Sequence, residues 1–457
     1  VLDCFFDPPT PPRAFAVPIH TPPPPGAPRT RDETGAGRML RIGGRTRHTR
    51  SVALIPCVLM QTLSEIVAHR IRAAGGWIGF DDFMQTVLYT PGLGYYTGGG
   101  QPFALPGDST GSRGDFVTAP MLGPWLAEAI VTWATPLWPQ LTDLETGRRP
   151  VREFGAGRGD LAAALMARGA FEMELIELSA GLRQLQSQTT QGLGRINWQD
   201  QLTPGFTGLV IANEVLDAMP VKCFEWAGDD QVLEWGVALA DTAASGPRLQ
   251  WQHRAAPESL RKVVLARQQA ATARGWPWSP GYRGEWCPWI APWMTALSES
   301  MTAGAVLLID YGFARPELDH PGRSQGSLSA HYRHQRFDHP DALIDRLGQQ
   351  DLTAHVDFSQ AAAAAIDAGF SVSGFVTQSR FLMDCGLIDS AQKMIDGISD
   401  QTERYRVLQS LQTLTMESEM GEVFKCLLLT KGLTPQGQAA LMELGFSAGD
   451  RRESLWA

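Results

Sequence analysis

The sequence of 457 residues lacks several features that would assign it to a specialised class of protein. Its six cysteines are scattered, and no two of them form a Cys-x-x-Cys pair. A disulfide framework and a zinc site are therefore not expected, and a reducing compartment fits best. The purely apolar runs, such as "CVLM" at residues 57–60, are far too short to span a bilayer.

Positive charge is also scarce over most of the chain. The sequence carries 39 Lys and Arg against 48 Asp and Glu, a formal net charge of −9 at pH 7. Residues 1–60 hold eight of the arginines and only four acids, so the remainder is more acidic still. Because proteins that bind nucleic acid present a basic face, we expect no nucleic-acid partner. The tryptophans between Trp226 and Trp293 are expected in a core or an interface rather than in a base-stacking platform.

Residues 1–60 differ in composition from the rest. Ten prolines fall within the first 28 positions, and the arginine-rich stretch "RMLRIGGRTRHTRS" follows. Such a segment buries too little apolar surface to offset the entropy cost of ordering it. Three interpretations are open: a disordered tail, an organelle transit peptide, or upstream sequence from a mis-assigned start. In the last case, Met39 or Met60 is the true start. Because the proline density does not suit a transit peptide, we expect a bacterial cytoplasm, or the mitochondrial matrix if the protein is eukaryotic.

The remaining sequence predicts an α/β fold. Residues 61–150 read as a helical N-terminal region, in which "GFDDFMQTVLYT" predicts a helix that begins at Asp81 or Asp82. Residues 151–435 alternate short apolar strands with helices, which predicts a mainly parallel, Rossmann-like sheet covered on both faces. Insertions at about 222–303 and 313–359 interrupt this pattern, and residues 436–457 are expected to be a C-terminal tail.

The stretch "REFGAGRGD" places Gly155, Gly157 and Gly159 at the first strand-to-helix turn. In a doubly wound sheet, ligands bind beyond the carboxyl ends of the strands. Glycine allows a positive φ there and lets a ligand lie against the main chain. A simple tight turn explains the glycines equally well, so the choice depends on the residues downstream.

Acidic residues around this turn favour S-adenosylmethionine over NAD. Glu177 ends the next predicted strand, where a carboxylate can accept both hydroxyls of a ribose; the alternative is a surface carboxylate. The dinucleotide fingerprint needs a third glycine where this chain has Asp160. Glu153 and Asp160 would repel the phosphates of NAD but suit a cofactor that carries a sulfonium and an ammonium group. We therefore disfavour an NAD-dependent oxidoreductase.

The motifs, taken together, resemble those of one family. "EFGAGRGDL", "IELSAGLRQLQ", "IANEVLDAMPV", "LLIDYG" and "DLTAHVDF" occur in this order, after "FMQTVLYTPGLGYY" and "GDFVTAP". Over roughly residues 62–432 the sequence resembles the MidA-type class I methyltransferases, whose mitochondrial members are complex I assembly factor seven. The resemblance implies a seven-stranded sheet with "VFKCLLLT" as the antiparallel last strand. It also implies methyl transfer to a protein, which in the mitochondrial members is an arginine of a complex I subunit.

Methylation of arginine needs carboxylates, because the guanidinium is protonated below a pKa of about 12 and a nitrogen lone pair must be freed. The predicted strand "IANEVLDAMP", which breaks at Pro220, presents Asn213 and Glu214 at its carboxyl edge. Glu214 is the candidate to hold the guanidinium, and Asn213 to contact cofactor or acceptor. Asp217 either takes part in catalysis or caps the next turn. Tyr311, after a neighbouring strand, either lines the acceptor slot or packs in the core.

The segments "HYRHQ" and "DLTAHVDF" supply a further group of polar residues. His331 and His334 lie three apart, a spacing that allows a metal site. We expect instead no metal and a hydrogen-bonded wall of the acceptor groove, with His355 as a candidate proton acceptor. The predicted catalytic set is Glu214, Asn213, Asp217 and His355. The predicted cofactor contacts are Glu153, Gly155, Gly157, Gly159, Glu177, Asp200, Asn213, and Asp115 in the loop "GDFVTAP".

Two departures from the family pattern concern the acceptor. Met121 stands where the family usually has Glu, and Gln349 and Gln350 stand where it usually has Pro-Gly. Both departures affect the identity of the substrate more than the binding of the cofactor. The alternatives to a protein-arginine acceptor are a small-molecule acceptor and a non-catalytic assembly chaperone that retains the fold. A homodimer is a further expectation.

Overall fold

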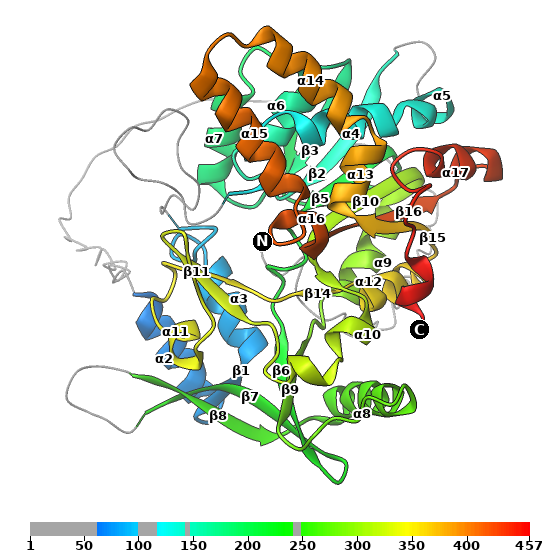
Figure 1. Cartoon of the computed structure of the whole chain (residues 1–457). Coiled ribbons are helices and arrows are strands. Elements are labelled where there is room, and N and C mark those ends of the chain that lie inside the picture. The colour runs from blue at the N-terminus through cyan, green and yellow to red at the C-terminus, as the bar shows by residue number, and fades with distance from the viewer. Residues whose placement is uncertain (1–61, 99–116, 142–146, 241–247) are drawn as a thin grey trace, which may run out of the picture. The chain divides into compact units, whose positions relative to one another are not determined.

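The computed structural model describes residues 62–98, 117–141, 147–240 and 248–457, and all of them belong to one unit (Figure 1). The extension 1–60 and the loop that carries Asp115 lie outside the described residues. No helix within the described ranges is long and apolar enough to cross a membrane. The four cysteines of these ranges, Cys223, Cys287, Cys385 and Cys426, are free thiols.

Seven strands form the main sheet. Their spatial order is β4 (Ile196–Gln199), β3 (Phe171–Ile176), β2 (Arg149–Phe154), β5 (Phe206–Asn213), β10 (Met301–Phe313), β16 (Phe424–Lys431) and β15 (Ser371–Thr377). The first five strands are parallel to one another, whereas β16 is antiparallel to both β10 and β15. The predicted seven-stranded sheet with "VFKCLLLT" as its antiparallel strand is therefore confirmed. A short strand, β14 (Val356–Asp357), pairs in parallel with the end of β10.

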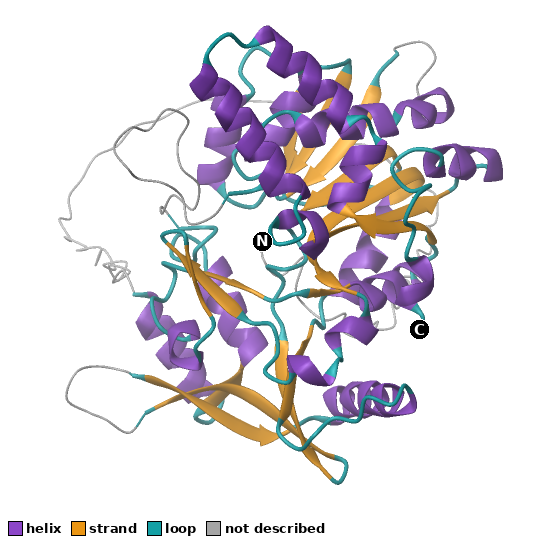
Figure 2. Ribbon diagram, in the orientation of Figure 1, coloured by secondary structure: helices purple, strands orange, loops and turns teal. Residues whose placement is uncertain are grey.

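Both faces of this sheet are buried, which is why its strands read as continuous apolar runs. Successive side chains of a strand point to opposite faces. Val306 and Leu308 of β10 accordingly pack into one hydrophobic cluster, and Leu307 and Ile309 into another. The first cluster includes α9 (Ile290–Ser300) and α12 (Phe358–Asp367); the second includes α4 (Trp125–Trp133), α6 (Asp160–Met166) and α13 (Gln378–Asp384). Figure 2 shows helices gathered around the strands of the sheet.

The tryptophan-rich insertion forms a second, antiparallel sheet. Its order is β1 (Trp77–Gly79), β7 (Gln231–Leu239), β6 (Lys222–Gly228) and β9 (Tyr282–Trp286), with β8 (Leu249–Ala255) paired to β7. α8 (Glu258–Ala273) packs on it through a cluster that includes Phe224 and Trp278. Trp278 and Trp293 are buried, as expected of core residues, whereas Trp276 is exposed.

The second insertion, 313–359, contains a small three-stranded sheet. β11 (Ser329–Tyr332) lies between β12 (Gln335–Phe337) and β13 (Asp351–Thr353), antiparallel to both. The short helices α10 (Arg315–Leu318) and α11 (Pro340–Leu343) flank it in sequence. The remaining helices are α2 (Leu63–Ala73), α3 (Phe80–Tyr89), α5 (Trp138–Leu141), α7 (Ala180–Thr189), α14 (Leu387–Gly397), α15 (Gln401–Thr415), α16 (Met420–Val423) and α17 (Pro435–Met442).

Three boundaries differ from the sequence prediction. α3 begins at Phe80 with Gly79 as its N-cap, because the Asp81 carboxylate is buried in an ion pair with Lys222 at 2.8 Å and caps nothing. β5 ends at Asn213 rather than near Pro220, since the chain turns at the next residue. Residues 436–457, predicted as a tail, pack against the fold: Phe446 is fully buried in the second cluster.

Candidate active site

A cavity of about 590 Å³ opens at the carboxyl ends of the parallel strands. We call it the large cavity. Its lining comes from the ends of β2, β3, β5 and β10, from the three-stranded sheet, and from residues beside α3 and α16. Ligand pockets typically measure about 300–1,000 Å³, so the large cavity has room for a nucleoside cofactor and part of an acceptor. Its position is the one that a doubly wound sheet predicts.

The glycine turn after β2 has the predicted backbone. Gly155, Gly157 and Gly159 have φ values of 57°, 53° and 87°, in the left-handed region that disfavours other residues. Gly155 and Gly157 line the large cavity. Gly159 is instead the N-cap of α6, where an added Cβ would lie 3.3 Å from the Cα of Gln186. Two glycines thus face the ligand space, and the third allows α6 to pack closely on α7.

Glu153 gives this turn a buried acid. It is 3% exposed, and within the described ranges its Oε2 atom has no hydrogen-bond partner. Burial first, and the charge of Asp160 second, raise its pKa to about 8. A buried acceptor without a donor costs free energy, so the site favours a ligand that brings a donor. The ammonium group of a methionine moiety supplies such donors, and the residues present therefore fit S-adenosylmethionine.

Asp160 is less able to repel a phosphate than its position in the sequence suggests. The Arg158 guanidinium binds it through both carboxylate oxygens, with N–O distances of 2.9 and 2.8 Å. This pair offsets the charge of Asp160, because opposite charges at such a distance attract strongly. Because Glu153 has a pKa of about 8 and Asp160 is paired with Arg158, the electrostatic argument against NAD is weaker than the sequence alone suggests.

Glu177 occupies the predicted position, immediately after β3 and in the wall of the large cavity. It is 7% exposed, and two donors fix its carboxylate: the Ser179 amide at 2.8 Å and the Gln186 side chain at 3.0 Å. Ser179 also caps α7, as predicted. Each carboxylate oxygen can accept more than one hydrogen bond, so Glu177 keeps acceptor capacity for a ribose diol. Asp200, by contrast, is exposed after β4 and does not line the large cavity.

The residues that follow β5 form a strained turn, residues 213–217, which we call the β5 loop. Glu214 has a φ of 55°, uncommon for a residue with a side chain, and the Asn213 amide donates to its Oε1 atom at 3.0 Å. Burial first and Asp217 second raise the pKa of Glu214 to about 8. The Oδ1 atom of Asn213 has no partner in the described part of the chain. Glu214 and Asn213 both line the large cavity.

Asp217, also in the wall of the cavity, accepts a hydrogen bond from the Tyr311 hydroxyl at 2.5 Å. Its other oxygen, Oδ1, is buried and lacks a partner among the described residues. Burial raises the pKa of Asp217 to about 6, and the Tyr311 bond opposes the shift. Asp217 lies in the turn before β6, so a cap of that turn and a role in catalysis both stay open. Tyr311 lines the cavity rather than packing only in the core.

The three-stranded sheet supplies the wall that the sequence predicted. His331 and Asp351 line the large cavity, and the Tyr96 hydroxyl donates to Asp351 at 2.8 Å. His334 lies in the β11–β12 turn, is exposed, and does not reach the cavity. No group of three or more His, Cys, Asp or Glu in the described ranges is arranged to hold a metal ion.

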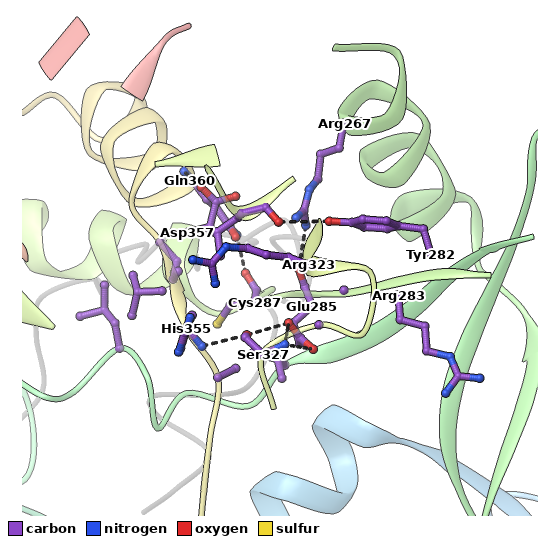
Figure 3. Close-up of a pocket in the computed structure, with 18 residues that line it drawn as sticks. Arg267, Tyr282, Arg283, Glu285, Cys287, Arg323, Ser327, His355, Asp357 and Gln360 are labelled. Atoms are coloured by element: carbon purple, nitrogen blue, oxygen red, sulfur yellow. Dashed lines mark hydrogen bonds between the residues drawn. The ribbon is translucent and has the colours of Figure 1, made fainter. Parts of the chain in front are cut away.

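His355 lines both the large cavity and a second cavity of about 30 Å³, which Figure 3 shows. Burial first, and then the cations Arg323, Arg336 and Lys425, lower its pKa to about 4. The imidazole is therefore neutral at pH 7, and its Nδ1 atom is unpaired within the residues that the structure describes. It can accept a proton only as a weak base.

The polar groups around the small cavity bond to one another. Glu285 accepts hydrogen bonds from the Ser327 amide and hydroxyl, and Ser327 in turn accepts from the His355 amide at 3.0 Å (Figure 3). Arg267 donates to the Glu285 carbonyl at 2.7 Å, and Gln360 donates to the Cys287 carbonyl at 2.5 Å. This cavity therefore supports the backbone of His355 and offers few free groups to a ligand.

Several cavity residues were not predicted. Tyr89, Tyr96, Arg158 and Arg336 line the large cavity. Asp310, which is fully buried, bonds to the β5 loop. The position of Asp310 could have been predicted, because it is an acid directly after the apolar run "AVLLI". The positions of Tyr89 and Tyr96 could not, since they depend on how α3 and the residues after it pack.

The sheet order, the antiparallel strand within it and the cavity over a glycine turn define a class I methyltransferase. A family model described as "Putative S-adenosyl-L-methionine-dependent methyltransferase" matches residues 129–376. The chain belongs to this family, the MidA-type methyltransferases that its motifs resemble, and S-adenosylmethionine is its cofactor.

Solved structures and curated relatives agree with this assignment. A COG1565 superfamily member from Burkholderia thailandensis, bound to S-adenosyl-homocysteine, is 34% identical with a TM-score of 0.71, covering 86% of this chain and 96% of that one. A native structure of such a protein from the same organism has a TM-score of 0.68. The mitochondrial protein arginine methyltransferase NDUFAF7 of Danio rerio is 25% identical over 79% of this chain and 84% of its own length. That of Homo sapiens is 24% identical over 78% and 80%.

Proposed function

We propose that this methyltransferase acts on an arginine side chain of a protein. The observation that carries the proposal is a pair of carboxylates, the half-buried Glu214 and the buried Asp217, in the wall of the large cavity that also holds the glycine turn. Asp351 adds a third carboxylate to the same wall. A guanidinium offers five N–H donors in a planar fork, which suits several carboxylates at once. The curated relatives are named protein arginine methyltransferases, which supports the same substrate class.

The unpaired acceptors of the site suit a cationic substrate. Asp217 Oδ1 and Asn213 Oδ1 are buried without partners in the described ranges, and a guanidinium would bond to both kinds of oxygen. Binding of a cation also favours the ionised form of a neighbouring acid, so the pKa of Glu214, about 8 in the ligand-free protein, falls when the acceptor enters. Glu214 then holds the acceptor as a carboxylate.

The protein contributes positioning and proton transfer. When bound, S-adenosylmethionine supplies an activated methyl group and a good leaving group. Glu214 orients the guanidinium nitrogen, and the nitrogen loses one proton as the new N–C bond forms. Asp217 is the proposed acceptor of that proton, because its pKa of about 6 lies near neutrality and its free oxygen faces no other donor in the described structure. His355, with a pKa of about 4, is the weaker candidate.

We assign the cofactor to the other half of the cavity. Gly155 and Gly157 would form the surface beneath it, Glu153 would face its ammonium group, and Glu177 would hold its ribose. Asn213 also lines the cavity and would contact the cofactor or the acceptor. Asp115 stays a prediction from the sequence, whereas Asp200 does not line the large cavity and is not assigned to the cofactor site. The curated relatives are named as mitochondrial proteins, and for this chain the compartment and the homodimer likewise stay predictions.

The test is to incubate the purified protein with methyl-labelled S-adenosylmethionine and a fractionated cell lysate. Mass spectrometry then locates the label. We expect labelled arginine in one or a few proteins, and no label with the Glu214→Gln variant. Label confined to small molecules would favour a small-molecule acceptor. Cofactor binding without any transfer would favour an assembly chaperone that keeps the fold.

A further inference from the structure

The β5 loop adopts a conformation that its own sequence does not favour. Glu214 has a φ of 55°, and such a backbone costs free energy unless the surroundings hold it in place. The residue in question is also the one proposed to hold the acceptor. The parts of the fold that hold the loop therefore bear directly on catalysis.

One buried carboxylate binds three successive amides of this loop. The amides of Val215, Leu216 and Asp217 donate to the Oδ2 atom of Asp310 at 3.1, 2.9 and 3.3 Å. The Glu214 amide donates to the carbonyl of Ile309 at 2.8 Å. Four consecutive amides thus bond to the last residues of β10. Successive amides that converge on one acceptor oxygen form a nest, which fixes the main chain of the loop.

Asp310 is itself rigidly placed. It is 0% exposed, and its other oxygen accepts the Tyr311 amide at 2.9 Å. β10 pairs with β5 through Ile309 and with β16 through Asp310 and Tyr311, so the strand has neighbours on both sides. Burial raises the pKa of Asp310, as do Asp217 and Glu214, whereas the amides of the loop lower it. Its only described hydrogen-bond donors are those of the loop and of Tyr311.

Tyr311 acts on the side chains of the loop in the way that Asp310 acts on its main chain. Its hydroxyl donates to Asp217 Oδ2, which leaves Oδ1 as the free oxygen. The Tyr311 ring is held edge-on to His355 at 5.7 Å and against Phe424 at 5.4 Å. The ring therefore has little freedom, and the orientation of the Asp217 carboxylate is fixed.

We propose that Asp310 and Tyr311 are positioning residues for methyl transfer. Asp310 fixes the main chain of residues 214–217, and Tyr311 fixes the carboxylate of Asp217, so that both acids face the large cavity. The proposal rests on the proposed roles of Glu214 and Asp217. The motif "LLIDYG", which contains Asp310 and Tyr311, thus has a positioning role. Neither Asp310 nor Tyr311 needs to contact the methyl group for this role.

The experiment compares Asp310→Asn and Tyr311→Phe with the wild-type protein. Both variants should bind S-adenosylmethionine with little change in Kd, because the glycine turn, Glu153 and Glu177 are untouched. Both should lose kcat for methyl transfer, by about 10²-fold for Asp310→Asn, the loss expected from a small misplacement of catalytic groups. Tyr282→Phe is the matched control, since in the described part of the chain the Tyr282 hydroxyl donates to the Leu318 carbonyl, and Tyr282 does not line the large cavity.

Amide hydrogen exchange tests the loop independently of the substrate. In Asp310→Asn, peptides that cover residues 213–219 should exchange at least about tenfold faster than in the wild type, while the rest of the sheet is unchanged. Unaltered exchange in this segment, or wild-type kcat in both variants, would overturn the proposal. If the wild type itself transfers no methyl group to arginine, the proposed function fails, and the exchange data still decide whether Asp310 holds the loop. If Asp310→Asn does not fold, Tyr311→Phe decides through its kcat.

Discussion

The side chain of Gln186 links Glu177 to the glycine turn: its Nε2 atom donates to Glu177 Oε2 and to the Gly157 carbonyl, both at 3.0 Å. Its Oε1 atom accepts from the indole of Trp198 at 2.9 Å. Gln186 is fully buried, so one amide in α7 ties the end of β3 to the end of β2. Glu177 is the proposed contact to the ribose, and Gly157 is part of the proposed surface beneath the cofactor. Both therefore depend on Gln186, a residue that does not itself line the large cavity.

We predict that Gln186→Leu weakens cofactor binding without altering the lining of the cavity. The change removes a donor from the buried Glu177 carboxylate and from the partly buried Gly157 carbonyl, and an acceptor from the Trp198 indole, and an unpaired buried group costs about 1–3 kcal/mol. The melting temperature should fall, and the Kd of S-adenosylmethionine should rise by about tenfold, the equivalent of 1.4 kcal/mol. Thermal unfolding and isothermal titration measure the two effects. An unchanged Kd in a folded variant would show that Glu177 needs no support from Gln186.

Gly155→Ala should reduce cofactor affinity more than it reduces stability. The added Cβ would lie 3.2 Å from Cγ2 of Val215, at a position with a φ of 57° that faces the large cavity. Gly192→Ala is the matched control, because Gly192 also has a positive φ, 80°, but an added Cβ meets nothing within 4 Å. Both changes should cost about 1–2 kcal/mol of backbone strain. Only Gly155→Ala should weaken binding in isothermal titration; equal Kd values would remove Gly155 from the cofactor site.

Glu214→Gln should separate binding from transfer. The variant keeps the shape of the side chain and loses the charge that holds the acceptor. We expect little change in the Kd of S-adenosylmethionine and a fall in kcat of about 10²–10⁴-fold, the range typical of a lost acid or base. Glu172→Gln, at a partly exposed site with ion pairs to Arg148 and Arg195, should behave as the wild type. Full activity of Glu214→Gln would contradict the proposed role.

Cofactor binding should depend on pH through Glu153. Its pKa is raised from 4.5 to about 8, so at pH 7 the ligand-free protein holds this carboxyl group mainly protonated. A cationic ligand beside it favours the carboxylate, so binding releases a proton. Affinity should therefore rise from pH 6 to 8 and level off above pH 8. Titration calorimetry in buffers of different ionisation enthalpy should show proton release at pH 7, and Glu153→Gln should abolish it.

The same group predicts a trend in stability for the ligand-free protein. Because the folded-state pKa lies above the unfolded value, the contribution of Glu153 to stability is fully present below pH 4.5 and is lost as the pH rises towards 8. Glu153→Gln should therefore gain stability relative to the wild type between pH 5 and pH 8. Thermal melts across this range provide the check. A difference that does not vary with pH would mean that Glu153 is ionised in the folded protein throughout.

The sequence alone determined the main sheet and the place of the cofactor turn. Continuous apolar runs such as that of β5 indicate strands with both faces covered, and alternation with helices indicates parallel order. The backbone of Gly155 and the position of Glu177 followed from the same pattern, because both depend on where a strand ends. The Ser179 cap is a contact between neighbours in the chain and was equally visible.

Only the tertiary structure decided how the acids of the site are held. Tyr96 and Asp351 are 255 positions apart, and Asp310 is more than 90 positions from the amides that it binds. No local pattern encodes such contacts, because they exist only when the sheet and its insertions are assembled. The raised pKa values of Glu153 and Glu214 have the same origin, since removal from water by distant segments is their largest cause. Residue type and strand register set which groups reach the site, and packing sets their charge and orientation.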